Sequence, residues 1–265
     1  MFKIKLIKKY DLVIIPLVYV VFGFFLYLNQ DKFIYIPDNR PHGECSFAHE
    51  DTMVIDDAVV RGYYARASDP KGVVVHYHGN AGNACDRKWY LPFLINAGWS
   101  VFLVEYPGYA DPDHKPNTND ILDSVIEIGK YINDKNYQRL AIIGESIGAG
   151  PGSWHATKYK ADTLILITSF ERLSSRAQRA VWIYPASLML KRDMLVDKWA
   201  QSAPSVLIIA AERDTVIPLR HTKRLYESLD PEITTFKVIK GTTHNTLYSH
   251  PKFMETIVQH LQQLP

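Results

Sequence analysis

The stretch Leu140-Ala141-Ile142-Ile143-Gly144-Glu145-Ser146-Ile147-Gly148-Ala149-Gly150 combines an apolar run with a glycine-rich turn. The run has the length of a buried strand, and the residues after it match the pattern G-x-S-x-G, which places a serine on a tight turn between a strand and a helix. A larger side chain at Gly144 or Gly148 would collide with the strand or with the new helix. We therefore expect a strained backbone at Ser146. Its hydroxyl is expected to point into solvent at a helix N-terminus, where N–H groups can stabilise an oxyanion.

Short apolar runs alternate with helical patterns along the rest of the chain. This alternation indicates a mostly parallel sheet covered by helices on both faces. The expected parallel strands are Val73–Val75, Val101–Val104, Leu140–Ile143, Leu164–Ile167, Val206–Ile209 and Phe236–Ile239, and residues 52–55 and 58–67 are expected to be antiparallel at the sheet edge. The expected helices are 86–97, one opened by Thr118 or Asn119, 218–229 and 251–264, the last two with proline in the first position.

Length and composition limit the class of protein. The 265 residues suit one large α/β domain with an appendage, and an apolar fraction of 47% is enough for a substantial core. The net charge of +2 comes without a basic stripe, which argues against nucleic acid as a partner. Cys45 and Cys85 form no metal-binding pattern, and we expect two free thiols and no metal site. A single disulfide is the alternative if the domain is exported.

An uncharged apolar run, Leu12 to Leu28, follows the lysines at positions 3, 5, 8 and 9. As a helix this run is about 25 Å long, the lower end of what crosses a bilayer. We expect residues 1–30 to be an uncleaved single-pass anchor and residues 31–265 to be the folded domain. The lysines predict a cytoplasmic N-terminus and a domain on the extracytoplasmic side. The alternatives are a cleaved signal peptide, although no A-x-A-like site follows, and a helix buried in a soluble core.

The interval between Ile167 and Val206 is too long for a simple crossover between two strands. Residues 170–203 therefore form an insertion. It contains large apolar side chains, namely Trp182, Tyr184, Leu188, Met189 and Leu190. Two interpretations remain open: a short lid over an apolar pocket, or a surface helix beneath which these side chains pack.

A serine nucleophile needs a base, and the base needs an orienting carboxylate. Asp214 follows the strand that ends near Ala210, and His244 follows the strand that ends at Ile239. Both therefore lie at the carboxyl ends of parallel strands, where open α/β sheets place their sites. The alternative for Asp214 is a role in the turn before Pro218, and Glu212 is the second candidate for the orienting acid.

The loop His78-Gly79-Asn80-Ala81-Gly82-Asn83 follows the strand Val73–Val75. Its small residues allow backbone N–H groups to approach a substrate. The expected oxyanion hole consists of the N–H of Ile147 and that of Asn80 or Ala81. For His78 we favour a structural role within the loop over a catalytic one.

Taken together, these motifs resemble a membrane-anchored group of α/β-hydrolases. The group includes the eukaryotic ABHD-type serine hydrolases and bacterial relatives described as serine aminopeptidase-like. The matching residues are 78–83, 106–109, 144–148, Thr168-Ser169-Phe170, Asp214 and His244. The resemblance implies an α/β-hydrolase fold with Ser146 as nucleophile and Asp214 and His244 as its partners. The chain departs from the group at Pro107, where an arginine is common.

The expected function is therefore a serine hydrolase that cleaves carboxylic esters through a Ser-Asp-His triad and an acyl-enzyme, with no metal or organic cofactor. The apolar anchor and insertion favour a small or lipid-like acyl substrate, and the resemblance adds acyl thioesters. Two alternatives remain: an aminopeptidase or amidase of the same fold, and a catalytically silent scaffold that binds partners at the membrane.

Overall fold

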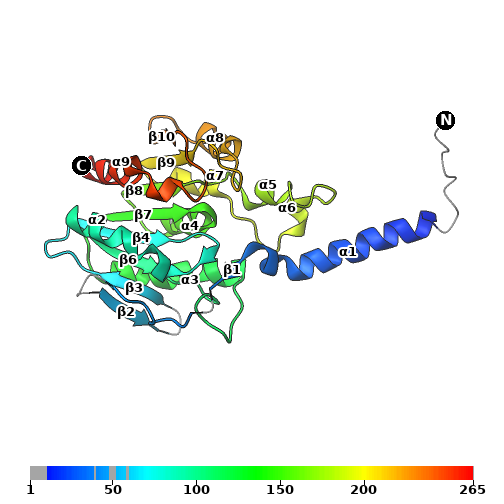
Figure 1. The fold of residues 1–265 in the computed structure, drawn as a ribbon, viewed down its shortest axis with the longest axis horizontal. Helices are drawn as coiled ribbons and strands as arrows, with labels where there is room; N and C mark the ends of the chain where they lie inside the picture. The colour runs from blue at the N-terminus through cyan, green and yellow to red at the C-terminus, as the bar shows by residue number, and fades with distance from the viewer. Residues whose placement is uncertain (1–10, 39, 48–51, 58–59, 265) are drawn as a thin grey trace.

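The computed structural model describes residues 11–38, 40–47, 52–57 and 60–264. Eight strands form one sheet in the order β10-β9-β8-β7-β4-β6-β3-β2 (Figure 1). Their bounds are β2 Thr52–Asp56, β3 Arg61–Ala65, β4 Gly72–Tyr77, β6 Trp99–Val104, β7 Leu140–Glu145, β8 Thr163–Ile167, β9 Val206–Ala211 and β10 Thr234–Ile239. The six strands from β10 to β6 are parallel, whereas β3 runs antiparallel to both β6 and β2. The expected edge arrangement is confirmed.

Helices cover both faces of this sheet (Figure 1). One face packs against α3 (Thr118–Asn133), α4 (Ala149–Lys158) and α8 (Leu219–Glu227), and the other packs against α2 (Leu91–Asn96) and α9 (Pro251–Gln262). Strand β4 explains why two cores form. Val73 and Val75 belong to the first core and Val74 to the second, and all three are fully buried. Because side chains alternate along a strand, an unbroken apolar run must be covered on both sides.

Most helix ends agree with those predicted from the sequence, and two predictions are wrong. Asn117 caps α3 by accepting a hydrogen bond from the N–H of Asp120, and Pro251 opens α9. Pro218, however, is the residue before α8 rather than its first residue. The single helix predicted over 86–97 is instead the 3₁₀ helix η1 (Ala84–Tyr90) followed by α2. Pro92 explains the break, because proline lacks the N–H that an α-helix would need to bond four residues back.

Helix α1 (Asp11–Ile34) projects away from the sheet and its helices (Figure 1). Within residues 12–34, an 18-residue window has a mean hydropathy of 2.3 and is only 6% buried, so the alternative of a helix buried in a soluble core is wrong. The helix is long and apolar enough to cross a membrane, at about 36 Å for its 24 residues. It continues to Ile34, past the predicted start of the folded domain at residue 31. The lysines at positions 3, 5, 8 and 9 lie outside the described residues.

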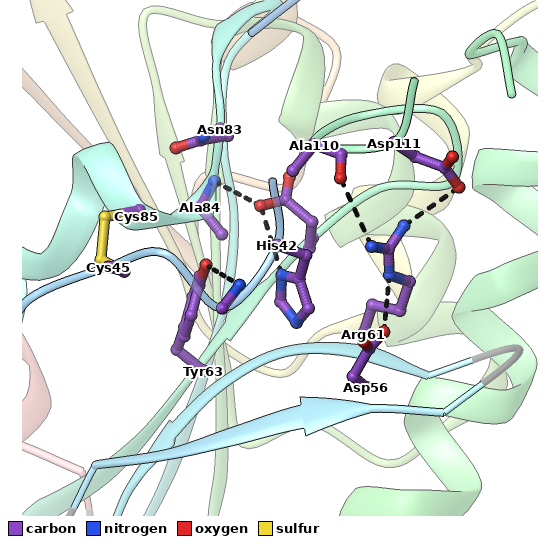
Figure 2. A network of polar contacts seen from close by, with 12 residues as sticks. His42, Cys45, Asp56, Arg61, Tyr63, Asn83, Ala84, Cys85, Ala110 and Asp111 are labelled. Carbon is purple, nitrogen blue, oxygen red and sulfur yellow. Dashed lines mark hydrogen bonds and ion pairs between the residues drawn. A yellow bond between two sulfur atoms is a disulfide. The ribbon is translucent and has the colours of Figure 1, made fainter. Parts of the chain in front are cut away.

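Cys45 and Cys85 form a disulfide, with Cα atoms 5.8 Å apart, so the expectation of two free thiols is wrong. The bond ties the segment after α1 to η1, beside a network of polar contacts (Figure 2). In that network the guanidinium of Arg61 donates to both Asp56 and Asp111. Sequence alone could not test the pairing, because it depends on a Cα approach between positions 40 residues apart.

Candidate active site

Ser146 lies at the turn from β7 into η2 (Ser146–Gly148), which leads directly into α4. Its φ of +51° is a left-handed value that a serine rarely adopts, in line with the strain expected from the sequence. The flanking glycines are required by close packing. A Cβ atom at Gly144 would lie 2.7 Å from the carbonyl oxygen of Gly148, and one at Gly148 would overlap the carbonyl oxygens of Tyr77 and His78.

The Ser146 side chain does not point into open solvent, contrary to our expectation. Ser146 is 7% exposed and lines a cavity of about 440 Å³, which we call the Ser146 cavity. This volume is within the usual range for small-molecule sites. Burial arises because α1 and the insertion between β8 and β9 lie over the carboxyl end of β7. Neither of these distant segments could be placed from the sequence pattern around the serine.

Besides Asn80, Ser146 and Ile147, the walls of the Ser146 cavity come from three parts of the chain. The end of α1 contributes Leu26, Gln30, Phe33 and Ile34. The insertion contributes nine residues between Phe170 and Leu190, and the loop after β9 contributes Val216 and Ile217. Most of this lining is apolar, which suits an acyl chain. The insertion thus lines an apolar cavity, and it contains the short helices α5 (Leu173–Ala177), α6 (Ala186–Met189) and α7 (Val196–Trp199). Its role as a lid stays a prediction.

Asp214 and His244 meet at the carboxyl ends of β9 and β10. The Nδ1 atom of His244 donates to Oδ2 of Asp214 at 2.7 Å. The other oxygen, Oδ1, accepts from the N–H groups of Val216 and Ile217, both at 2.8 Å. Asp214 thus holds the turn before Pro218 and also orients His244, so the two interpretations from sequence are compatible. The fixed Nδ1–H leaves Nε2 of His244 as the atom able to accept a proton.

The structure also shows how Ser146 and Glu212 lie relative to His244. No hydrogen bond joins Ser146 to His244 in the part of the chain that the structure describes. Such contacts are often long without substrate. Glu212, the second candidate for the orienting acid, accepts instead from the N–H of Gly241 at 2.8 Å and makes no described contact with His244.

The loop after β4 meets Ser146 at the same cavity. Asn80 and Ile147 line the Ser146 cavity, whereas Ala81 does not and is exposed. Ala81 instead lies in the two-residue strand β5 (Ala81–Gly82), which pairs with β1 (Ile36–Pro37). The structure therefore brings Asn80 and Ile147 beside Ser146 and leaves Ala81 outside.

His78 is completely buried beneath this loop. Its Nδ1–H donates to the carbonyl oxygen of Gly79 at 2.7 Å, and its ring packs 4.1 Å from that of Tyr106. Glu105, 3.5 Å from Nε2 of His78, accepts from the N–H of Ala84. These contacts fit the structural role that we favoured for His78.

Glu145, the residue before Ser146, is the centre of a buried polar cluster that sequence analysis missed. Its carboxylate accepts from Tyr90 at 2.7 Å, from His76 at 3.0 Å and from Arg87 at 3.1 Å. Burial alone would raise the pKa of Glu145, but the charge of Arg87 and the hydrogen bonds hold that pKa below its ordinary value. Burial also lowers the pKa of His76. The turn at Ser146 is therefore fixed by an ionised, fully bonded carboxylate.

Other residues at the site carried no sequence signal. The cavity-lining residues of α1 looked like any other part of an apolar span, and Arg176, in the insertion, looked like a surface charge. Burial and the neighbouring Arg179 lower the pKa of Arg176, whose Nε donates to the carbonyl oxygen of Val216. Within the described ranges, no group of three or more His, Cys, Asp or Glu side chains is arranged to hold a metal ion.

No protein-family model matches the chain. It is 26% identical over 238 residues to the uncharacterized protein YfhR of Escherichia coli (strain K12), a match that covers 85% of this chain and 81% of YfhR. It is also 23% identical over 223 residues to the human protein ABHD12B, covering 74% of this chain and 62% of ABHD12B. ABHD12B is thus a distant relative.

Solved structures establish the fold. An esterase of Pyrococcus furiosus, Pf2001, superimposes with a TM-score of 0.65 at 15% identity, covering 87% of this chain and 98% of its own. A monoacylglycerol lipase of Paleococcus ferrophilus gives a TM-score of 0.58 at 17% identity, covering 77% of this chain and 100% of its own. The chain has the α/β-hydrolase fold predicted from its sequence.

Replacing Glu145 by glutamine tests the buried cluster. A lowered pKa means that Glu145 contributes stability above its ordinary pKa of 4.5 and that this contribution is lost as the pH falls below 4.5. We expect Glu145→Gln to lower the free energy of unfolding at pH 7 by about 3 to 5 kcal/mol, because Arg87 loses its buried partner. As the pH falls below 4.5, the free energy of unfolding should also decrease less in the variant than in the wild type.

Urea unfolding at pH 7 and at several acidic pH values measures both effects. Glu127→Gln is the matched control, because Glu127 forms an exposed pair with Lys130 on α3. The control should change stability by less than about 1 kcal/mol. If Glu145→Gln and Glu127→Gln gave the same stability and the same acid response, the cluster would not hold the turn as described.

Proposed function

We propose that this protein is a serine hydrolase that cleaves carboxylic esters of acyl chains. The observation that carries the proposal is the position of Ser146 on a strained turn in the wall of an apolar cavity, with Asn80 and Ile147 beside it. The hydrogen-bonded pair His244 and Asp214 supports it further. The esterase and lipase among the structural neighbours are consistent with the same chemistry.

The proposed reaction begins when Nε2 of His244 takes the proton of the Ser146 hydroxyl. The oxygen of Ser146 attacks the acyl carbonyl carbon, and the N–H groups of Ile147 and Asn80 stabilise the oxyanion that forms. His244 then donates the proton to the leaving alkoxide, which departs as an alcohol. A water molecule, activated by His244, hydrolyses the acyl-enzyme and releases the carboxylic acid.

Asp214 is suited to its proposed role by the contacts of its two oxygens. Oδ1 is held by the N–H groups of Val216 and Ile217, which leaves Oδ2 to accept from Nδ1–H of His244. The carboxylate therefore selects the tautomer whose Nε2 is free of a proton. It also stabilises the imidazolium that forms when His244 takes the serine proton.

The cavity lining favours an ester over the aminopeptidase alternative. A site for a free α-amino group needs an acidic side chain, and the described lining residues include Arg176 but no Asp or Glu. The lining does not distinguish an oxygen ester from an acyl thioester, so both remain within the proposal. A catalytically silent scaffold is disfavoured, because Ser146, Asp214 and His244 are all present with two of them already hydrogen bonded.

We propose that α1 anchors the protein in a membrane, with the N-terminus in the cytoplasm and the domain on the extracytoplasmic side. The length and apolarity of α1 support the anchor. The lysines before it, outside the described residues, support the orientation. The Cys45–Cys85 disulfide agrees with this side of the membrane, because disulfides persist mainly in oxidising compartments.

Substitutions at the triad positions test the catalytic proposal. With p-nitrophenyl butyrate as substrate, Ser146→Ala should lower kcat/KM by about 10³-fold or more, because the nucleophile is lost. Asp214→Asn should lower kcat by about 10³- to 10⁴-fold, because the amide favours the wrong tautomer of His244. Steady-state kinetics of folded, purified variants measure these changes.

Glu212→Gln is the matched control for Asp214→Asn, because Glu212 lies two residues away and contacts Gly241 instead of His244. It should keep kcat within about twofold of wild type, as expected for a group that touches neither substrate nor His244. A harmless Asp214→Asn with a damaging Glu212→Gln would reassign the orienting acid. Wild-type turnover by Ser146→Ala would refute the serine mechanism.

Orientation in the membrane is tested by the oxidation state of the cysteines and by a C-terminal reporter enzyme that works only after export. We expect an active reporter, and a Cys45–Cys85 disulfide that resists thiol-blocking reagents added during cell lysis. Replacing the lysines at positions 3, 5, 8 and 9 by glutamine should weaken both results. An inactive reporter with reduced cysteines would reverse the topology. A mature chain beginning near Asn29 would show a cleaved signal peptide instead of an anchor.

A further inference from the structure

The tip of the insertion, residues 180–190, is an uncharged segment that the hydrolytic mechanism does not use. Its sequence is Ala-Val-Trp-Ile-Tyr-Pro-Ala-Ser-Leu-Met-Leu, flanked by Arg179 on one side and by Lys191 and Arg192 on the other. Trp182 is 79% exposed and Leu188 is 77% exposed. Neither side chain lines the Ser146 cavity. In water these large apolar surfaces would be unfavourable, so they point to a nonpolar environment.

The insertion tip packs directly against the middle of α1. The ring of Tyr184 stacks on that of Tyr19 with centroids 4.4 Å apart, and it lies over Gly23, where a Cβ atom would be 2.7 Å away. The Tyr184 hydroxyl donates to the carbonyl oxygen of Tyr19 at 2.7 Å, and the Tyr19 hydroxyl donates to that of Ile183 at 2.8 Å. The two segments are therefore joined by reciprocal hydrogen bonds as well as by ring stacking.

This contact fixes the depth of the insertion tip relative to the proposed membrane span. Tyr19 lies twelve residues before Asp31, which is about 18 Å along a helix. The hydrocarbon core of a bilayer is about 30 Å thick. If α1 crosses a membrane, Tyr184 and its neighbours lie well inside the hydrocarbon region.

The first charged residue after the insertion tip lies at the same level as the first charged residue after the apolar run of α1. Lys191, the first charge after the insertion tip, pairs with Asp31, the first charge after the apolar run, at 2.9 Å. The side chain of Gln30 also joins the segments, because its oxygen accepts from the N–H of Lys191 and its nitrogen donates to the carbonyl oxygen of Met189. One membrane surface can therefore pass through this shared polar level, with both apolar segments on the same side of it.

Most backbone polar groups of the insertion tip form hydrogen bonds within the protein. Such internal bonding is required in the hydrocarbon region, where no water can replace it. The amide nitrogen of Gln178 donates to the carbonyl oxygen of Tyr184 at 2.8 Å, and its amide oxygen accepts from the N–H of Ala186 at 3.0 Å. The N–H groups of Leu188 and Met189 donate to the carbonyl oxygen of Pro185. Irregular backbone at membrane depth is tolerated when its polar groups are bonded in this way.

We propose that the insertion tip enters the adjacent membrane leaflet beside α1, and that the Ser146 cavity takes the acyl chain of an ester lipid directly from that leaflet. The cavity fits this route because Leu26 and Phe33 of α1 line it together with Val181 and Met189 of the tip. The occupant of the exposed apolar surface is the lipid bilayer, since that surface is continuous with the span of α1. The proposal rests on the hydrolase function proposed above and names its substrate class.

The depth of the tip is measured with the full-length protein in phosphatidylcholine vesicles. Ser187→Cys in the tip is labelled with the environment-sensitive fluorophore NBD, and Lys252→Cys on α9 is the matched control. Both positions are exposed, and Cys45 and Cys85 are held in their disulfide. In Figure 1, α9 lies at the opposite end of the molecule from α1. We expect blue-shifted emission and quenching by acyl-chain nitroxide lipids at position 187 only. Water-like emission at both positions would overturn the proposal.

The substrate route is measured by comparing two substrates in two charge variants. Leu188→Glu places a charge on the tip, and Phe93→Glu places one at another exposed apolar position, on α2. Leu188→Glu should hydrolyse a monoacylglycerol held in vesicles about tenfold or more slowly, because a charge at membrane depth is costly. It should hydrolyse soluble p-nitrophenyl acetate at the wild-type rate. Phe93→Glu should match wild type on both substrates.

Three results would overturn the route. In the first, Leu188→Glu hydrolyses the vesicle lipid at the wild-type rate. In the second, Leu188→Glu loses activity equally on both substrates. In the third, the wild type cleaves the acetate but no vesicle lipid. Failure of the hydrolase function is a different outcome, in which the wild type cleaves neither substrate while the label at position 187 still reports hydrocarbon.

Discussion

The close packing of the turn after β7 against the end of β4 is the constraint on which the site depends. At Gly148 there is no room for even a Cβ atom beside the carbonyl oxygens of Tyr77 and His78. This approach brings Ser146 next to the loop that carries Asn80. A strained residue costs on the order of 1 to 3 kcal/mol, and such a conformation persists only where its surroundings determine it. Here the surroundings include Glu145, which is held by hydrogen bonds from Tyr90, His76 and Arg87.

The same loop connects the site to α1. The chain that leaves the helix pairs with the loop, as the N–H of Ile36 donates to the carbonyl oxygen of Asn80 at 3.0 Å. The side-chain amide of Asn80 donates in turn to the carbonyl oxygen of Ile34 at 3.1 Å. The apolar helix therefore contacts both the proposed oxyanion loop and, through Gln30, the insertion. This arrangement makes the helix part of the cavity as well as a candidate anchor.

Structure could be predicted from the sequence where the determining forces are local or periodic. Each central strand is buried on both faces, and this burial requires consecutive apolar residues. An apolar run in the sequence therefore predicts such a strand. The G-x-S-x-G turn is also local, because the two glycines and the serine meet constraints set within a few residues. Asp214 and His244 could be paired because neighbouring parallel strands end at the same edge of the sheet.

Contacts between distant parts of the chain could not be predicted from the sequence. The burial of Ser146 requires α1 and the insertion to meet, through contacts such as that between Tyr184 and Tyr19, 165 positions apart. An apolar helix has no periodic pattern that marks which side faces a cavity. The Cys45–Cys85 bond depends on the path of the segment after α1, and the break before α2 depends on one proline within an otherwise helical pattern.

The nucleophile is identified by locating the covalent adduct that an unlabelled fluorophosphonate forms with the full-length protein. The protein is digested after reaction, and tandem mass spectrometry identifies the modified residue. If Ser146 is the nucleophile and His244 its base, the adduct should lie on Ser146 in the wild type and should form far more slowly in His244→Ala. An adduct on another residue, or active protein that hydrolyses esters without any adduct at Ser146, would rule out Ser146 as the nucleophile.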